Sequence, residues 1–318
     1  MVNRFLKIAA LSALLIPGIS WCDGEEPPDV YVRVGLVREE LELIRHEMGK
    51  PRNDQPDIGV TNAAPREVFF QAMTLFSKAD RMCFEQTRDR APVPETPATV
   101  PQPPDVFRVA DAALERIKRV KQYLNIPDAT KELSRDANKT PNDVFISIVQ
   151  ANRQLNLLLD QQFSPSDVFQ QVTRAIGYTS RLLAQFPGST RIHEPPLFER
   201  GKRPADVYHR LVGCYKKVRQ IAELSGHECL DLAIESDRIE EDTTPSDVYD
   251  IASLLVSELA YLHTQVATTT PPPGVYYPGR KFPSHVYQRA GILESQLLEL
   301  AKWVSQYPEW LNEGARNE

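Results

Sequence analysis

A five-residue motif occurs eight times in this chain and constrains its fold more than any other feature. The motif reads Pro, any residue, an acid, Val, and then Tyr or Phe. The copies begin at Pro27, Pro65, Pro103, Pro141, Pro165, Pro204, Pro245 and Pro283. The last copy carries His285 where the others carry Asp or Glu. Such self-similarity is typical of repeat proteins, in which each copy forms the same structural unit.

The composition of the motif predicts the start of an α-helix. Proline suits the first helical position, because its missing N–H would be unpaired there and its φ angle is already helical. The acid then falls at the third helical position, where a carboxylate accepts a hydrogen bond and offsets the positive helix end. Thr140, Ser164 and Thr244, which precede three of the prolines, are favourable N-cap residues. We therefore interpret the acids as capping groups and not as catalytic groups.

An apolar column follows each motif. With Pro counted as position 1, positions 4, 8, 11, 15 and 18 are apolar in every copy except at Thr179. The steps of four and three average 3.5 residues, which is the period of helical bundles. Position 5 is aromatic in every copy. We expect these rings to close the end of a bundle, with the Tyr hydroxyls toward solvent.

The spacing of the copies divides them into two sets. The motif prolines are 38, 38 and 38 residues apart, then 24, and then 39, 41 and 38. This series indicates duplication of a four-helix unit. The predicted fold class is all-α: an eight-copy helical repeat arranged as two four-helix bundle-like units with long irregular linkers. The predicted units are residues 21–162 and 163–307, followed by a C-terminal tail at 308–318.

The linkers set the direction of the helices. Each long gap leaves about 16 residues after a helix of about 30 Å, and an extended chain of that length reaches up to about 50 Å. The helices of one unit are therefore expected to be parallel, whereas the short link at 161–164 permits only an antiparallel hairpin. Segments 128–138 and 229–241 have sequences compatible with a turn or more of helix. Apolar linker residues are expected to pin the linkers to the bundles: Ile58, Val60, Leu197, Phe198, Val275, Tyr276 and Tyr277.

The hairpin also predicts where the two units meet. The fourth and fifth helices leave the short link side by side, so their outer flanks are expected to form the seam. Leu159, Ile176 and Leu183 lie outside the apolar columns and are the expected seam contacts. A seam between two units is also a favourable place for a ligand or a partner.

The first residues resemble a secretory signal peptide. Arg4 and Lys7 precede an apolar run from residue 8 to 16, and cleavage after Ser20 leaves small residues at the required positions. This predicts a periplasmic or secreted protein, with residues 1–20 removed. A lipoprotein anchored through Cys22 is the alternative, which the bulky Trp21 directly before it disfavours. No later segment is long and apolar enough to predict a membrane span.

The net charge bears on the partner. The formal charge is −6, and removal of residues 1–20 takes away two positive charges and no negative ones, which leaves −8. This balance argues against nucleic acid and against an acidic membrane surface. The basic runs at 116–121 and 215–219 are interpreted as solvated helix faces.

The four cysteines are predicted to form two disulfides, because an even number in an exported chain favours pairing. The preferred pair is Cys214–Cys229, since the linker that carries Cys229 turns back past Cys214, and Cys22–Cys83 follows by elimination. A zinc or copper site that uses His227 with Cys229 is the less favoured alternative, because cysteines of exported proteins are more often bonded to each other.

The sequence holds no recognisable catalytic motif. It contains no Gly-rich phosphate loop, no Cys-x-x-Cys, no His-Glu-x-x-His and no Gly-x-Ser-x-Gly. We therefore predict no catalytic, cofactor-binding or metal-binding residues, no cofactor, and no enzyme activity. The predicted function is a protein-interaction scaffold of the bacterial periplasm, with another envelope or periplasmic protein as its partner. The alternative is a small-ligand-binding or sensory module with its site in a bundle or in the seam.

Overall fold

The computed structural model describes residues 24–97, 100–131, 133–159, 163–233, 243–266 and 270–311. Its helices are α1 (Pro27–Glu47), α2 (Pro65–Thr87), α3 (Pro103–Tyr123), α4 (Pro141–Leu158), α5 (Pro165–Leu183), α6 (Pro204–Leu224), α7 (Pro245–Thr264) and α8 (Pro283–Gln306). Two short strands, β1 (Gly59–Thr61) and β2 (Asp231–Ala233), and a 3₁₀ helix at Pro308–Leu311 complete the described elements. Every long helix begins at a motif proline, and the prediction of an all-α fold is confirmed.

The motif acids cap the helices, as predicted. In each of the eight copies, the side chain at the third helical position accepts a hydrogen bond from the N–H of the residue before Pro, at 2.7–3.2 Å. Thr140, Ser164 and Thr244 complete the reciprocal bond through their hydroxyls. In the eighth copy, Nδ1 of His285 takes the place of the carboxylate oxygen.

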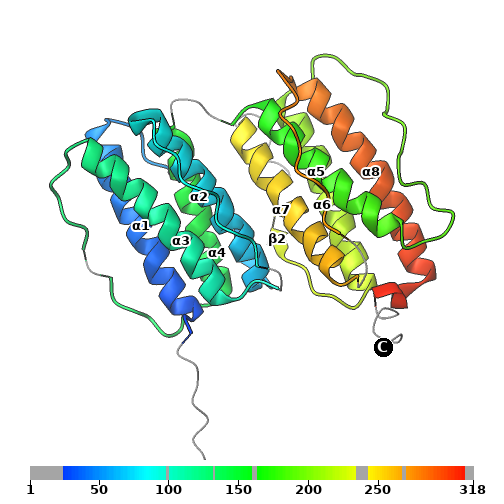
Figure 1. Ribbon diagram of the computed structural model, residues 1–318, viewed down its shortest axis with the longest axis horizontal. Coiled ribbons are helices and arrows are strands. Elements are labelled where there is room, and N and C mark those ends of the chain that lie inside the picture. The colour runs from blue at the N-terminus through cyan, green and yellow to red at the C-terminus, as the bar shows by residue number, and fades with distance from the viewer. Residues whose placement is uncertain are drawn as a thin grey trace, which may run out of the picture.

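The helices pack in two sets of four (Figure 1). In the first unit, α1–α4, the neighbours around the bundle follow the order α1, α3, α2, α4; in the second unit, α5–α8, they follow α5, α7, α6, α8. Each helix therefore matches the helix four places later. The four motif prolines and the four Val residues at position 4 line one small hollow in each unit. All four helices of a unit thus begin at the same end, which we call the proline end.

Each unit has its own apolar interior. All residues at positions 4, 8, 11, 15 and 18 are buried in all eight copies. Thr179, the polar exception, satisfies its hydroxyl by donating to the Ala175 carbonyl one turn earlier, at 2.9 Å. The expectation for the position-5 rings is wrong, because Pro and Val line the hollow at the proline end. Several of these rings instead lie under cations from neighbouring segments, as Tyr287 lies under Arg210.

Long linkers run back along the helices as straps. The linker after α1 crosses α4, where Gln154 donates to the Pro51 carbonyl, and the linker after α5 crosses α8, where Gln296 donates to the Arg191 carbonyl. Both glutamines occupy position 14 of their copies. The linker after α7 crosses α5, and Pro272 lies against the bare face of Gly177. The same crossings in both units confirm that the linkers belong to the repeat.

The structure bears on two expectations for the linkers. The described residues of 128–138 contain no helix, and residue 132 lies outside them; of 229–241, Asp231–Ala233 is a strand, and the expectation for 234–241 lies outside the described residues. Of the expected apolar pins, Val60 is buried and Ile58 is half-buried. Leu197 is 90% exposed and Tyr276 is 91% exposed, and Phe198 and Tyr277 are exposed as well. These side chains project from straps that are already held by backbone and polar contacts.

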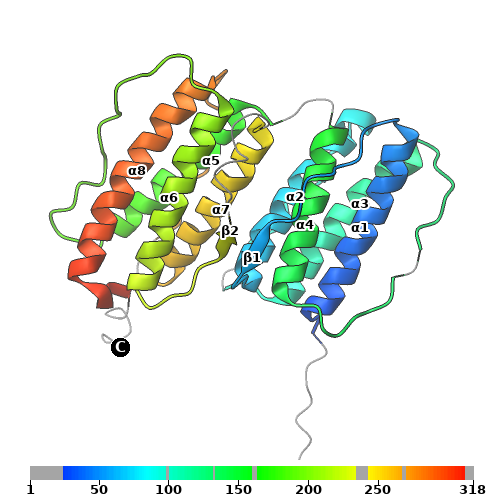
Figure 2. The same ribbon diagram turned by 180° about the vertical axis from the view of Figure 1, so that it is seen from behind.

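The two units run in opposite directions (Figures 1 and 2). The colours show that the helices of the first unit begin at the lower edge in Figure 1, whereas those of the second begin at the upper edge. The helices that pack across the seam are α2 and α7, and β1 pairs with β2 in an antiparallel ribbon beside them. The expectation that α4 and α5 form the seam is wrong. α4 and α5 run in opposite directions, but α2 and α7 supply the flanks that meet.

Among the described residues, no helix combines the length and the hydropathy that crossing a membrane requires. The predicted signal peptide at residues 1–20, and Cys22 with it, lies outside the described residues.

Candidate functional site

The seam between the units is rich in charge. Lys78 of α2 has a fully buried side chain and donates to both carboxylate oxygens of Asp250 of α7, at 3.0 and 3.2 Å. Burial raises the pKa of Asp250, and the nearby ammonium group opposes that rise. Because an unpaired buried charge is costly, this pair ties α2 to α7 in one register.

A second charged group lies farther along the same seam. Arg66 and Glu67 begin α2, and Glu258 approaches them from α7; Arg66 lies 2.7 Å from a Glu67 oxygen and 3.9 Å from a Glu258 oxygen. Burial raises the pKa of both carboxyl groups, and the neighbouring Glu67 charge adds to the rise at Glu258. One guanidinium therefore faces two buried carboxyl groups whose pKa values are both raised.

Arg66 connects this group to the linker between α6 and α7. Its guanidinium donates to the Glu228 carbonyl at 2.6 Å and lies 4.0 Å from the centre of the Tyr261 ring. The Tyr261 hydroxyl is 3.3 Å from Nδ1 of His227. The guanidinium is thus held in place by both units.

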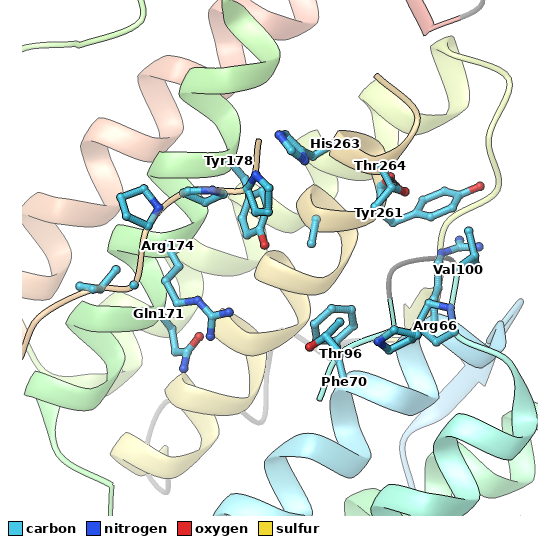
Figure 3. Close-up of a pocket in the computed structure, with 18 of the residues that line it drawn as sticks. Arg66, Phe70, Thr96, Val100, Gln171, Arg174, Tyr178, Tyr261, His263 and Thr264 are labelled. Atoms are coloured by element: carbon cyan, nitrogen blue, oxygen red, sulfur yellow. Dashed lines mark hydrogen bonds between the residues drawn. The ribbon is translucent and has the colours of Figure 1, made fainter. Parts of the chain in front are cut away.

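A cleft of about 820 Å³ opens where Arg66 and Tyr261 reach the surface (Figure 3). Five segments line it: the start of α2, the linker after α2, the middle of α5, the end of α7 and the linker after α7. Their side chains include the rings of Phe70, Tyr178 and Tyr261 and the guanidinium groups of Arg66 and Arg174. Both units are therefore needed to form the cleft.

The lining of the cleft combines rings, prolines and positive charge. The described residues that line it include no acid. Pro271, Pro272 and Pro273 form part of one wall, and Pro272 is seated on α5 at Gly177. His263 lies edge-on to Tyr178, and burial lowers the pKa of its imidazole, so that it is neutral at pH 7. The positive charge of the cleft thus comes from its arginines.

The predicted disulfide Cys214–Cys229 is not formed. Both cysteines are buried free thiols. Sγ of Cys214 faces α8, 4.0 Å from the Ala290 carbonyl, whereas burial and the nearby Glu258 charge of α7 raise the pKa of the Cys229 thiol. The two side chains therefore point to different neighbours. Burial raises the pKa of the Cys214 thiol to about 12.

Cys83 is also a buried free thiol, and its sulfur lies 3.4 Å from the Thr87 hydroxyl one turn later in α2. Its predicted partner, Cys22, lies outside the described residues. The alternative of a metal site has no counterpart in the described chain, where no three His, Cys, Asp or Glu side chains form a group that suits a metal ion.

Sequence reasoning passed over the residues that build the seam. Lys78 and Glu258 occupy position 14 of the second and seventh copies. Position 14 lies three residues after position 11 and four before position 18, so helical spacing places it on the flank of the apolar column. A charged residue at position 14 could therefore have indicated that this flank is buried against another charged surface. It could not have indicated that α2 pairs with α7.

Comparison of the chain with protein-family models finds no match, and comparisons with curated proteins and with solved structures find none either.

Proposed function

We propose that this chain is a protein-interaction scaffold of the bacterial periplasm and that a segment of its partner binds in the seam cleft. The observation that carries the proposal is the joint construction of the cleft by both units, with aromatic and cationic side chains on its walls. Function resides in such sites and not in the fold as a whole.

The lining suits an extended peptide. Rings and prolines offer flat apolar contacts, while Gln170, Gln171 and Thr264 add side chains that hydrogen-bond a peptide backbone. The charged groups of the seam hold α2 against α7, so the walls are in place before the partner arrives. A preformed site loses less conformational entropy on binding, which favours affinity.

Site-specific photo-crosslinking tests the proposal. A photoreactive phenylalanine analogue replaces Tyr178 or Phe70 in the cleft, and in a control it replaces Tyr123, which is 56% exposed at the end of α3. The variants are produced and irradiated in the cells that make the protein. We expect one defined protein to be attached at both cleft positions and not at Tyr123. Attachment of no protein at the cleft, or of the same proteins at Tyr123, would contradict the proposal.

The second candidate is a small-ligand-binding module that uses the same cleft. A specific observation favours it: the volume of about 820 Å³ lies in the range of small-molecule pockets, and Arg174 suits an anionic group. The low-molecular-weight fraction of a periplasmic extract would then raise the melting temperature of the protein. The Arg174→Ala variant should lose that response. A thermal shift without protein attachment in the crosslinking experiment selects this candidate over the scaffold.

A further inference from the structure

Exposed apolar side chains are unevenly distributed between the two units. In the second unit, the linkers after α5 and α7 carry six large ones: Ile192, Leu197, Phe198, Tyr276, Tyr277 and Phe282. The described linker residues of the first unit carry one, Val93. The straps of the second unit are held by the same kinds of contact as those of the first, so these side chains are not needed to pin them.

Some of these side chains converge at the proline end of the second unit. The rings of Phe198 and Phe282 come from different linkers and both lie near His285, with ring centres 5.1 and 5.9 Å from the imidazole. Phe198 is 44% exposed and Phe282 is 52% exposed. Arg280 lies over Phe282, 5.2 Å from its ring centre. We call the surface formed by Leu197, Phe198, Arg200, Arg280, Phe282 and His285 the aromatic patch.

Positive charge surrounds the aromatic patch. The segments 198–206 and 279–289 contain six cationic residues and two acids, and Arg200, Arg203 and Arg280 are exposed. A hydrogen bond of 3.2 Å from the N–H of Lys202 to the Ser284 hydroxyl joins the two segments. The corresponding segments of the first unit, 59–67 and 137–147, have no such excess, because they contain two cationic residues and two acids.

The eighth copy is the one whose cap is not an acid. His285 makes the same capping bond as the acids of the other copies, so the cap is kept while a negative charge is removed from the middle of the patch. An Asp at this position would cap α8 better, because a carboxylate also offsets the positive helix end. The aromatic patch therefore combines exposed rings, a local excess of positive charge and the omission of the one acid that the repeat specifies.

We propose that the aromatic patch is a docking surface for an acidic segment of a partner protein that also carries apolar side chains. Charge complementarity selects the acidic segment, and exposed rings beside arginines are the side chains that dominate protein interfaces. The surface is separate from the seam cleft, because α8 packs against α5 and α6 and not against the first unit. Like the proposed function, this docking surface assumes a protein partner, but it uses different residues from the seam cleft.

Fluorescence anisotropy with a short fluorescent peptide that alternates glutamate and leucine tests the docking surface in the full chain. We expect binding that weakens as salt screens the charges. Peptides that alternate lysine with leucine, or glutamate with serine, should bind at least roughly tenfold more weakly, since each lacks one of the two required features. Equal binding of all three peptides, or no binding of the first, would overturn the proposal.

Matched variants locate the surface. His285→Asp should weaken peptide binding by roughly tenfold while raising the melting temperature, whereas a purely structural role would change stability alone. Arg200→Glu with Arg280→Glu should abolish binding. The control, Arg108→Glu with Arg119→Glu, makes the same charge change on exposed residues of α3 and should leave the affinity unchanged. Tyr178→Ala in the seam cleft should also leave it unchanged, which separates this test from that of the proposed function.

Two other occupants are distinguished in the same series. Sedimentation with phosphatidylglycerol vesicles tests an anionic membrane surface, and sedimentation velocity over a range of protein concentrations tests a second copy of this chain. Vesicle binding or self-association that the Arg200 and Arg280 changes abolish, without binding of the peptide, would overturn the assignment to an acidic protein segment.

Discussion

Along the apolar columns inside each unit, helices meet through aliphatic side chains; at the seam, α2 meets α7 through charges. Two ion pairs also join helices inside the first unit, Asp80 with Arg116 and Glu40 with Lys121, but these residues lie outside the column positions. Val34, Val37 and Leu41 of α1 are typical of the interior and are completely buried. Lys78 and Glu258 are typical of the seam, and they are as deeply buried as many interior residues. The two regions thus differ in chemistry and not in depth.

The difference indicates that the interiors and the seam have separate roles, one in stability and the other in the arrangement of the units. Apolar interiors gain free energy in proportion to the area they bury, but many arrangements of such surfaces are nearly equivalent. Buried ion pairs add little net stability, yet they penalise every arrangement that leaves a charge unpaired. We infer that the interiors stabilise the units and that Arg66, Lys78 and their partners select how the units meet.

The largest expected effect comes from Arg66→Met. This change leaves Glu67 and Glu258 buried without their cation, and breaking a buried pair in this way costs about 3–5 kcal/mol. Chemical denaturation followed by circular dichroism measures the loss. Leu155→Ala, a cavity control inside the first unit, should cost about 2–5 kcal/mol, but it should not alter the seam. Crosslinking between β1 and β2, which reports how the two units meet, should fall in Arg66→Met alone. An equal fall in both variants would contradict separate roles for the interiors and the seam.

Lys78→Met sharpens the comparison at the other charged group. The single change leaves the buried Asp250 carboxylate unpaired and should destabilise by about 2–4 kcal/mol, somewhat less than a fully enclosed pair because Asp250 retains some solvent contact. Adding Asp250→Leu should recover most of that loss, since two apolar residues fill the place of the pair. If the double variant is as unstable as Lys78→Met, the ion pair itself stabilises the protein, and its role is not limited to selecting how α2 packs against α7.

The raised pKa values of Glu67 and Glu258 predict a pH dependence that is specific to the seam. Because burial raises the pKa of both groups, the folded state binds a proton that the unfolded chain releases near pH 4.3. Stability from this pair is full below that pH and is lost as the pH rises through the raised pKa. The free energy of unfolding should therefore fall as the pH rises above about 4.3. Glu258→Gln should flatten the profile, and an unchanged slope in that variant would contradict a raised pKa at Glu258.

Two helix glycines test the straps. Gly291 of α8 is covered, since an added Cβ would lie 2.6 Å from the Pro196 ring and 2.8 Å from Arg210, whereas Gly213 of α6 faces open space. Gly213→Ala should stabilise by about 0.5–1 kcal/mol, because Ala is the better helix former. Gly291→Ala should destabilise by about 1–2 kcal/mol, because the strap must move. Thermal unfolding measures both, and a gain in both variants would show that the strap is not tightly seated.

The smallest expected difference concerns the caps. Asp143→Ala removes the two bonds that this carboxylate accepts from the N–H and the hydroxyl of Thr140, whereas Asp105→Ala removes the one capping bond from the Gln102 N–H. The first should cost about 1–2 kcal/mol and the second about 0.5–1 kcal/mol. Equal costs would indicate that the Thr140 hydroxyl contributes nothing to the cap.

The sequence by itself determined the helices, their starts, their caps and their buried faces. These features depend on contacts between residues three or four positions apart, so the repeated motif specifies them wherever it occurs. The spacing of the prolines also determined the two sets of four and the parallel direction within each set, because the length of a linker limits where the next helix can begin. The sequence did not predict that most apolar strap residues are exposed, or that Cys214 and Cys229 are free thiols.

Only the tertiary structure decided which helices meet at the seam and which side chains face the cleft. Lys78 and Asp250 are 172 residues apart in the chain, and no local pattern states that position 14 of the second copy faces position 6 of the seventh. Cys214 and Cys229 are close in sequence, yet their side chains face different helices: Cys214 faces α8, and Cys229 lies near Glu258 of α7. The physical reason is the same in each case: local periodicity specifies the buried face of a helix, whereas the partner of its flank depends on how whole units fit together.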